Sequence, residues 1–302
     1  MRTTTWAYAG RGGRGPRIYR LGALFLVFLW LLPSCVTSDA VSKFAGESSQ
    51  ALGQGRSLFE DLKASCMRQQ RAGLEIPRDK NGVFDLPAYK KAAAVKECRD
   101  FAAQQPGLLA ALQVLTDYFA ALSQLAATGT ARAGKEAAAN PQAAGTSGLA
   151  GDAVKALSKL STFLGQFAAA GYREKHLTQD VKARDQDIQI VTDALVEVVK
   201  EKYERQLRRE QEALRDQGLS VLEASNTPAL RALLRDRWLE KVDGLESRKE
   251  KAEAFAQALH MVRDGHKKLA EAPNLRAKDV AATLKQYTDE LSALLPALQK
   301  AL

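Results

Sequence analysis

The chain has 302 residues, of which 46% are hydrophobic and 26% are charged, a balance that excludes both a disordered chain and a polytopic membrane protein. The net charge of +9 is concentrated at the start, because the first 34 residues contain five arginines and no acidic residue. Without that segment the net charge falls to +4, which leaves too weak a positive field to direct the chain onto nucleic acid.

Residues 1–34 have the pattern of a secretory signal peptide. A basic stretch precedes an uninterrupted apolar run at 21–32, and Pro33 ends that run. A helix that spans a bilayer needs about 20 apolar residues, whereas the apolar region of a signal peptide needs about 7 to 15. The run therefore predicts export of the chain and removal of residues 1–34.

The junction Leu32-Pro33-Ser34-Cys35 resembles the lipobox of bacterial lipoproteins, with Pro33 in place of the usual Ala, Ser or Thr. The resemblance implies that Cys35 is acylated and that a lipid anchor attaches the chain to a membrane. In such lipoproteins an Asp after the cysteine favours the inner membrane, so Val36 implies the periplasmic face of the outer membrane. The alternative is an uncleaved signal anchor with an unmodified Cys35, which also places the rest of the chain in the periplasm.

The remaining two cysteines form an even pair. If Cys35 is acylated, Cys66 and Cys98 are left together in an oxidising compartment. Apolar neighbours at helical spacing place both thiols on the inward-facing sides of their helices. The sequence therefore predicts a disulfide between Cys66 and Cys98, and the alternative is two buried free thiols.

The rest of the chain predicts helices. Alanine and leucine dominate, and no stretch alternates apolar and polar residues for long enough to indicate a sheet. Apolar residues at spacings of three and four predict a first helix over 39–71. A second helix is expected to begin near Asp85, which is suited to cap it, and Pro106 is expected to kink or restart that helix.

Residues 128–151 are rich in Ala, Gly and Thr, and they predict a flexible loop before a third helix near 152–170. The longest regular segment, 178–217, contains neither Pro nor Gly and predicts a rod of about 60 Å that ends at Gly218. Thr227 is expected to cap an antiparallel return helix.

The charged stretch around 243–251 interrupts the apolar stripe of the return helix and is a candidate for a bend. A final helix completes an elongated all-α bundle of roughly five to seven helices with a long antiparallel helical hairpin. Its expected parts are the signal peptide at 1–34, N-terminal helices with the disulfide at 35–127, the loop at 128–151, and the hairpin with the final helix at 152–302, in one bundle with 35–127.

Residues able to perform chemistry are few and scattered. The histidines are His176, His260 and His266, and the spacing of the last two does not place them on one helical face. His266 follows an apolar stripe, which favours a hydrogen-bonded core histidine over a metal ligand. No metal-binding spacing, phosphate-binding glycine loop or nucleophile elbow occurs, and the carboxylates are expected on solvated faces. The sequence therefore predicts no catalytic residue, no metal and no cofactor, and a protein that is not an enzyme.

Two features are candidates for binding. Leu219, Val221 and Leu222 are expected at the tip of the hairpin, either folded back to close it or exposed as a contact for a partner. A set of aromatic residues forms either ordinary core or the lining of a pocket for an apolar ligand: Phe101, Tyr118, Phe119, Phe163, Phe167 and Trp238.

Together these features predict a lipid-anchored periplasmic scaffold or adaptor that binds a protein of the cell envelope. The alternative is a small-molecule or lipid-binding module with a pocket inside the bundle. A third hypothesis, a helical module that shapes membranes, needs a basic face on one side, and the mixed charges of the helices disfavour it.

Overall fold

The computed structural model of the chain confirms the prediction of an all-α protein. Apart from a two-residue antiparallel pairing of β1 (Thr130–Ala131) with β2 (Tyr172–Arg173), the regular structure of the described residues is helical. The predicted signal peptide lies outside these residues except for its last two positions. The described residues are 33–72, 79–83, 85, 87–88, 98–131, 148–170, 172–173, 177–223, 227–273 and 278–300, without the side chains of 33–37, 130–131, 167–170, 172–173 and 278.

The predicted first helix is two helices, α2 (Pro33–Gln54) and α3 (Arg56–Ala72), with a turn at Gly55 between them. The Gly55 N–H donates to the Leu52 carbonyl at 3.0 Å, and the Gly55 carbonyl accepts from the Leu58 N–H at 3.1 Å. A Cβ at Gly55 would overlap the ring of Phe255. The expectation of one continuous helix was wrong at Gly55, where a residue of low helix propensity lies against an aromatic ring from α9.

The second helical region contains α5 (Arg99–Thr128), which includes Pro106 and ends at Gly129 in a left-handed conformation, with φ of 71°. Asp85 accepts a hydrogen bond from the Ala88 N–H at 2.9 Å, as a helix cap does. Among the described residues, α5 is the one helix long and apolar enough to cross a membrane, and half of its apolar stretch is buried inside the protein. It packs there against α2 and α3.

The predicted loop at 128–151 falls mostly on residues 132–147, which lie outside the described residues. The third helix is α6 (Gly151–Ala170), close to its predicted bounds. The rod that follows consists of α7 (Leu177–Glu197), the π-helical turn η5 (Val198–Tyr203) and α8 (Glu204–Glu223). The wider π turn brings residues five apart into register, and it keeps both Val198 and Tyr203 buried.

The rod does not end at Gly218, contrary to prediction. α8 continues to Glu223, and Gly218 lies buried within it against the ring of Trp238. The Trp238 indole N–H donates to the Leu214 carbonyl at 3.0 Å. This glycine therefore permits the close approach of an indole from a neighbouring helix, and it does not terminate its own helix.

The return helix α9 (Pro228–Glu271) contains 44 residues and is about 66 Å long. Its predicted cap is confirmed, because the Thr227 hydroxyl accepts a hydrogen bond from the Leu230 N–H at 3.3 Å. α9 continues without a break through 243–251, where a bend was expected. Arg248 and Lys251 in this stretch are only 6% and 4% exposed, since polar partners inside the protein satisfy them and the helix continues.

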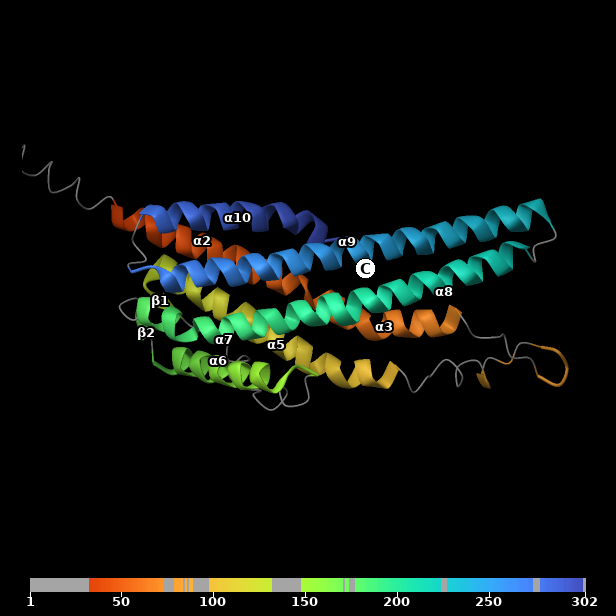
Figure 1. Cartoon of the computed structure of the whole chain (residues 1–302), viewed down its shortest axis with the longest axis horizontal. Helices are drawn as coiled ribbons and strands as arrows, with labels where there is room; N and C mark the ends of the chain where they lie inside the picture. The colour runs from red at the N-terminus through yellow and green to blue at the C-terminus, as the bar shows by residue number, and fades with distance from the viewer. Residues whose placement is uncertain are drawn as a thin grey trace, which may run out of the picture.

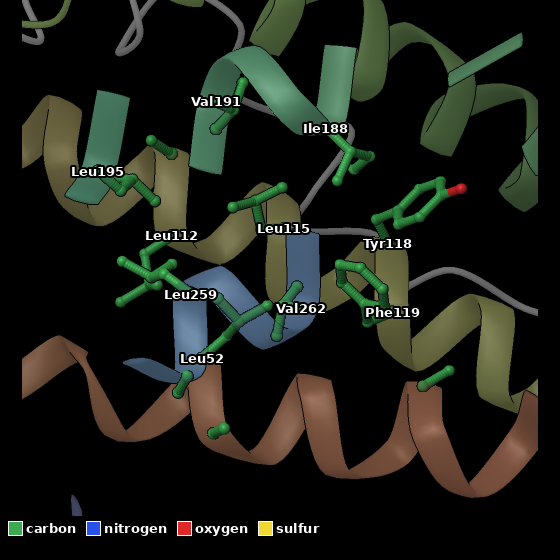
Figure 2. Close-up of a cluster of buried hydrophobic side chains, with 14 of the residues drawn as sticks. Leu52, Leu112, Leu115, Tyr118, Phe119, Ile188, Val191, Leu195, Leu259 and Val262 are labelled. Carbon is green, nitrogen blue, oxygen red and sulfur yellow. The ribbon is translucent and has the colours of Figure 1, made fainter. Parts of the chain in front are cut away.

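The last helix is α10 (Lys278–Leu298). It packs against α2 and α9, while α9 also contacts α7 and α8, α3 packs on α8, and α6 packs on α7. Figure 2 shows the centre of this arrangement, where apolar side chains from four helices meet. They include Leu52 of α2, Leu112, Leu115 and Phe119 of α5, Val191 and Leu195 of α7, and Leu259 and Val262 of α9, all buried.

The molecule is elongated, and its two ends differ (Figure 1). α8 and α9 lie side by side and extend beyond α3 and α5 (Figure 1), and the described part of the connector between α3 and α5, drawn in orange, also reaches this end of the long axis. α8 ends there at Glu223 and α9 begins at Pro228. The start of α2, which carries Cys35, lies at the opposite end of the long axis.

Gly218→Ala is expected to lower the free energy of unfolding by about 1 kcal/mol or more, because overlap with the hydrogen-bonded Trp238 outweighs the gain in helix propensity. Gly244→Ala in α9 is the matched control: a Cβ there meets no atom within 4 Å, so this change is expected to stabilise the protein by up to about 1 kcal/mol. Urea unfolding followed by circular dichroism measures both. Equal effects of the two substitutions would contradict the contact with Trp238.

Candidate functional site

The predicted partner contacts lie in the last turns of α8. Leu219 is 55% exposed and Val221 is 38% exposed, while Leu222 is partly buried. The start of α9 adds Leu230 and Leu233, which are 45% and 58% exposed. We call these five residues the apolar tip. Most of this apolar surface faces outward, so folding back to close the α8–α9 pair does not account for it.

The cysteines occupy two separate places. Cys35 lies in the first turn of α2, and its side chain is outside the described residues. Cys66 of α3 and Cys98, which precedes α5, form the predicted disulfide with a Cα–Cα distance of 5.8 Å. Both are buried, at 3% and 4% exposure, so the bridge ties α3 to the start of α5 inside the protein.

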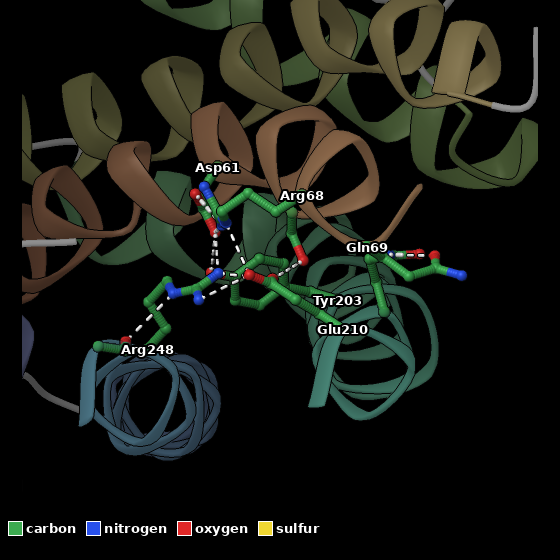
Figure 3. A network of polar contacts seen from close by, with 9 residues as sticks. Asp61, Arg68, Gln69, Tyr203, Glu210 and Arg248 are labelled. Carbon is green, nitrogen blue, oxygen red and sulfur yellow. Dashed lines mark hydrogen bonds and ion pairs between the residues drawn. The ribbon is translucent and has the colours of Figure 1, made fainter. Parts of the chain in front are cut away.

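Beside the disulfide, charged side chains from three helices form a buried cluster (Figure 3). We call it the ion cluster: Asp61 and Arg68 of α3, Tyr203 of η5, Glu210 of α8 and Arg248 of α9. Arg248 donates two bonds to Glu210, from Nη1 to Oε2 at 2.7 Å and from Nη2 to Oε1 at 2.9 Å. Arg68 bridges the two acids, donating from Nε to Glu210 at 2.7 Å and from Nη2 to Asp61 at 2.7 Å.

Two hydroxyl groups donate hydrogen bonds to the carboxylates of the ion cluster. Ser65 donates to Glu210 at 2.6 Å and Tyr203 donates to Asp61 at 2.8 Å. Burial raises the pKa of Glu210, but the hydrogen bonds from Arg248, Arg68 and Ser65 lower it by more, so the pKa lies below its ordinary value. Burial and the neighbouring Asp61 raise the pKa of the Tyr203 hydroxyl, which therefore stays protonated and able to donate.

A cleft of about 450 Å³ opens at the surface of the ion cluster, between α3, α8 and α9. Its floor contains Asp61, Glu210 and Arg248, which are buried. Exposed or partly exposed residues surround that floor: Arg68, Arg71 and Ala72 from α3, Gln217 from α8, and Lys241 and Gly244 from α9. Leu214 adds an apolar surface. The volume is within the range of small-molecule sites.

This cluster was not predicted from the sequence, because the carboxylates were expected on solvated faces. That expectation was wrong for Asp61 and Glu210, which are 9% and 1% exposed. A signal was present in the spacing. Glu210 lies between Leu207 and Leu214 on the apolar stripe of α8, and Arg248 follows Leu245 by three residues. Charges of opposite sign on facing apolar stripes indicate a buried ion pair.

His266 is a hydrogen-bonded core histidine, as predicted. It is 0% exposed, its Nδ1 bonds Asp185 at 2.9 Å, and its Nε2 bonds the Tyr118 hydroxyl at 2.9 Å. Burial, and then Asp180 and Asp185, raise the pKa of Tyr118. His260 is partly buried elsewhere on α9, and His176 lies outside the described residues. The hydrogen bonds from Asp185 through His266 to Tyr118 run from a partly exposed carboxylate into the core, and they join α7, α9 and α5.

The predicted aromatic set does not form one lining. Tyr118, Phe119 and Phe163 pack together in the core, and the space beside Tyr118 and Phe163 measures about 10 Å³, too small for an organic ligand. Trp238 packs on Gly218 in the α8–α9 pair, and the side chain of Phe167 lies outside the described residues.

The contribution of Glu210 to stability is expected to disappear at acid pH. An unfolded glutamate has a pKa of about 4.3, and the folded value is lower, so the contribution is complete above about pH 4.3 and is lost as the pH falls through the folded pKa. Thermal unfolding of the wild-type protein and Glu210→Gln, measured from about pH 7 to about pH 3, checks this. The difference in Tm is expected to narrow as the pH falls below about 4.3, because protonation of the glutamate, first in the unfolded chain and then in the folded protein, removes the charge that distinguishes it from glutamine. A constant difference would refute the lowered pKa.

Within the part of the chain that the structure describes, no group of three or more His, Cys, Asp or Glu side chains is placed to hold a metal ion. The surfaces that stand out there are the apolar tip and the cleft above the ion cluster.

Comparison with protein-family models, with curated proteins and with solved structures gives no match to this chain.

Proposed function

We propose that the chain is a lipid-anchored, non-enzymatic adaptor of the bacterial cell envelope. Acylated Cys35 attaches it to the periplasmic face of the outer membrane, and the α8–α9 pair carries the apolar tip to a protein partner in the periplasm. The observation that carries this proposal is the exposure of the apolar tip, where Leu219 and Leu233 are 55% and 58% exposed.

The surroundings of the apolar tip support a protein partner. Around it, the outer faces of α8 and α9 carry ion pairs such as Arg215 with Asp216 and Arg235 with Asp236, all highly exposed. An apolar centre with a charged, solvated rim is the usual arrangement of a protein–protein interface. A partner with an apolar groove is therefore expected to cover the tip, with the mixed charges setting its orientation.

The length of the molecule supports a membrane anchor at the other end. α2 begins at Pro33, two residues before Cys35, and this start lies opposite the apolar tip along the long axis (Figure 1). α9 alone is about 66 Å long. An anchor on Cys35 therefore holds the apolar tip well away from the bilayer surface.

The adaptor role is tested with a photo-crosslinking amino acid placed at Leu219 or at Leu233 in the cells that make the protein. A discrete adduct is expected at both positions and not at Lys285 on α10, which is 73% exposed and serves as control. The triple variant Leu219→Ser, Val221→Ser and Leu222→Ser, with crosslinking from position 233, is expected to lose the adduct while keeping its circular dichroism spectrum. An undiminished adduct in that variant would overturn the role of the apolar tip.

The anchor is tested separately by mass spectrometry of the purified N-terminus. A chain that begins at an acylated Cys35 is expected, and Cys35→Ser is expected to release the protein from membranes. An unmodified cysteine in a membrane-bound chain would support the signal-anchor alternative and refute lipidation.

A further inference from the structure

More positively charged than negatively charged side chains line the cleft above the ion cluster. Its two carboxylates, Asp61 and Glu210, are matched by Arg68 and Arg248 through direct ion pairs. Arg71 and Lys241 line the same cleft. They form no ion pair or hydrogen bond with any other described residue, so the lining has an excess of two positive charges.

Further donors face the same space. Arg68 uses Nε and Nη2 in the ion cluster, and its side chain is 38% exposed. Gln217 lines the cleft, is partly buried, and has no hydrogen bond within the described part of the chain. A guanidinium group matches the geometry of an oxyanion, and the ammonium of a lysine adds a point charge. Arg71, Lys241 and Gln217 therefore provide donors from three different helices around one space.

We propose that this cleft binds a phosphate monoester. Such a group has a charge close to −2 at neutral pH and three acceptor oxygens, which matches the two excess positive charges and the free donors. The volume of about 450 Å³ exceeds that of a phosphate group, and Ala72 and Leu214 supply apolar contacts for the organic part of the ester. The buried ion pairs below hold α3, α8 and α9 in fixed positions, so the donors are arranged before the ligand arrives.

The binding site is tested by isothermal titration calorimetry of the mature, disulfide-bonded chain with sn-glycerol 3-phosphate. Saturable binding of one molecule per chain is expected, with weaker binding of inorganic phosphate and none of glycerol. Arg71→Gln with Lys241→Gln is expected to weaken binding by about tenfold or more, since each removed partner contributes a charge-assisted hydrogen bond. Both side chains are exposed, so the Tm without ligand is expected to stay unchanged.

The matched control is Arg208→Gln with Arg215→Gln, which removes the same charge from α8 at positions that line a separate hollow. This variant is expected to bind like the wild-type protein. If both double variants lose affinity for glycerol 3-phosphate equally, the loss is due to the overall charge of the protein, and the proposed site is overturned. Absence of binding to the wild-type chain, or binding of succinate as tightly as the phosphate ester, would overturn it as well.

The source of the ester is distinguished by competition. Vesicles of phosphatidylcholine with phosphatidic acid, compared with phosphatidylcholine alone, are added before the titration. Displacement of glycerol 3-phosphate by the phosphatidic acid vesicles assigns the site to a lipid headgroup, and no displacement assigns it to a soluble ester; both results support the shared phosphate chemistry. This site does not depend on the adaptor proposal, because none of its residues belongs to the apolar tip.

Discussion

Glu210→Ala is expected to lower the free energy of unfolding by about 3 to 5 kcal/mol, the largest effect of a single substitution that we predict. The reason is the charge that remains. The side chain of Arg248 is 7% exposed and donates two hydrogen bonds to Glu210. Truncation therefore leaves a buried cation whose remaining partners are the Gly244 carbonyl at 3.1 Å and, as the one negative charge, Asp61 at 3.4 Å. Urea unfolding at neutral pH, followed by circular dichroism, measures the change.

The matched control is Glu212→Ala, two residues further along α8 on its exposed face, and it is expected to leave stability nearly unchanged. A double variant, Glu210→Met with Arg248→Met, removes both charges and is expected to be more stable than the sum of the single effects predicts. If Glu210→Ala unfolds at the same urea concentration as Glu212→Ala, the ion cluster does not contribute to folding.

Loss of the disulfide is expected to lower the free energy of unfolding by about 3 to 4 kcal/mol in the chain-entropy model. The bridge joins residues 32 positions apart, and without it the unfolded chain gains the freedom of that loop. Cys66→Ala with Cys98→Ala avoids placing a hydroxyl in the core, where both residues are buried. Urea unfolding of the double variant and of the wild-type protein with and without reductant gives the comparison.

Reductant is expected to destabilise the wild-type protein and to have no effect on the double variant. Thiol labelling provides an independent check. The purified protein is unfolded without reductant and then labelled, and if the disulfide is formed, neither Cys66 nor Cys98 reacts. Two labelled thiols there would refute the disulfide. Because Cys66 lies on α3 between Asp61 and Arg68, its loss is also expected to loosen the cleft.

The sequence predicted well what depends on neighbouring residues. The all-α class follows from apolar spacings of three and four, and the start of α9 follows from Thr227, whose hydroxyl satisfies a free N–H of the first turn. The inward position of Cys66 and Cys98 follows from the same periodicity. The exposure of Leu219 and Val221 was one of two alternatives in the sequence, because a local pattern does not reveal whether another helix covers them.

The errors share one physical cause. Gly218 resembles a local helix breaker, yet α8 continues through it and the ring of Trp238 occupies the place of its side chain, whereas Gly55 was expected inside one helix and instead lies at a turn against the ring of Phe255. Arg248 resembles a surface charge that interrupts an apolar stripe, yet it is buried because Glu210, 38 positions away, receives its hydrogen bonds. Such contacts join residues distant in sequence, and no window along the chain contains both partners.

By itself, therefore, the sequence determined which segments are helical, where several of them begin, and which faces turn inward, since backbone hydrogen bonds and hydrophobic periodicity act within a few residues. Only the tertiary structure decided which charges are buried together and where a cleft opens. The free energy of a buried charge depends on a partner within hydrogen-bond distance, and in this protein α3, α8 and α9 supply those partners from separate parts of the chain.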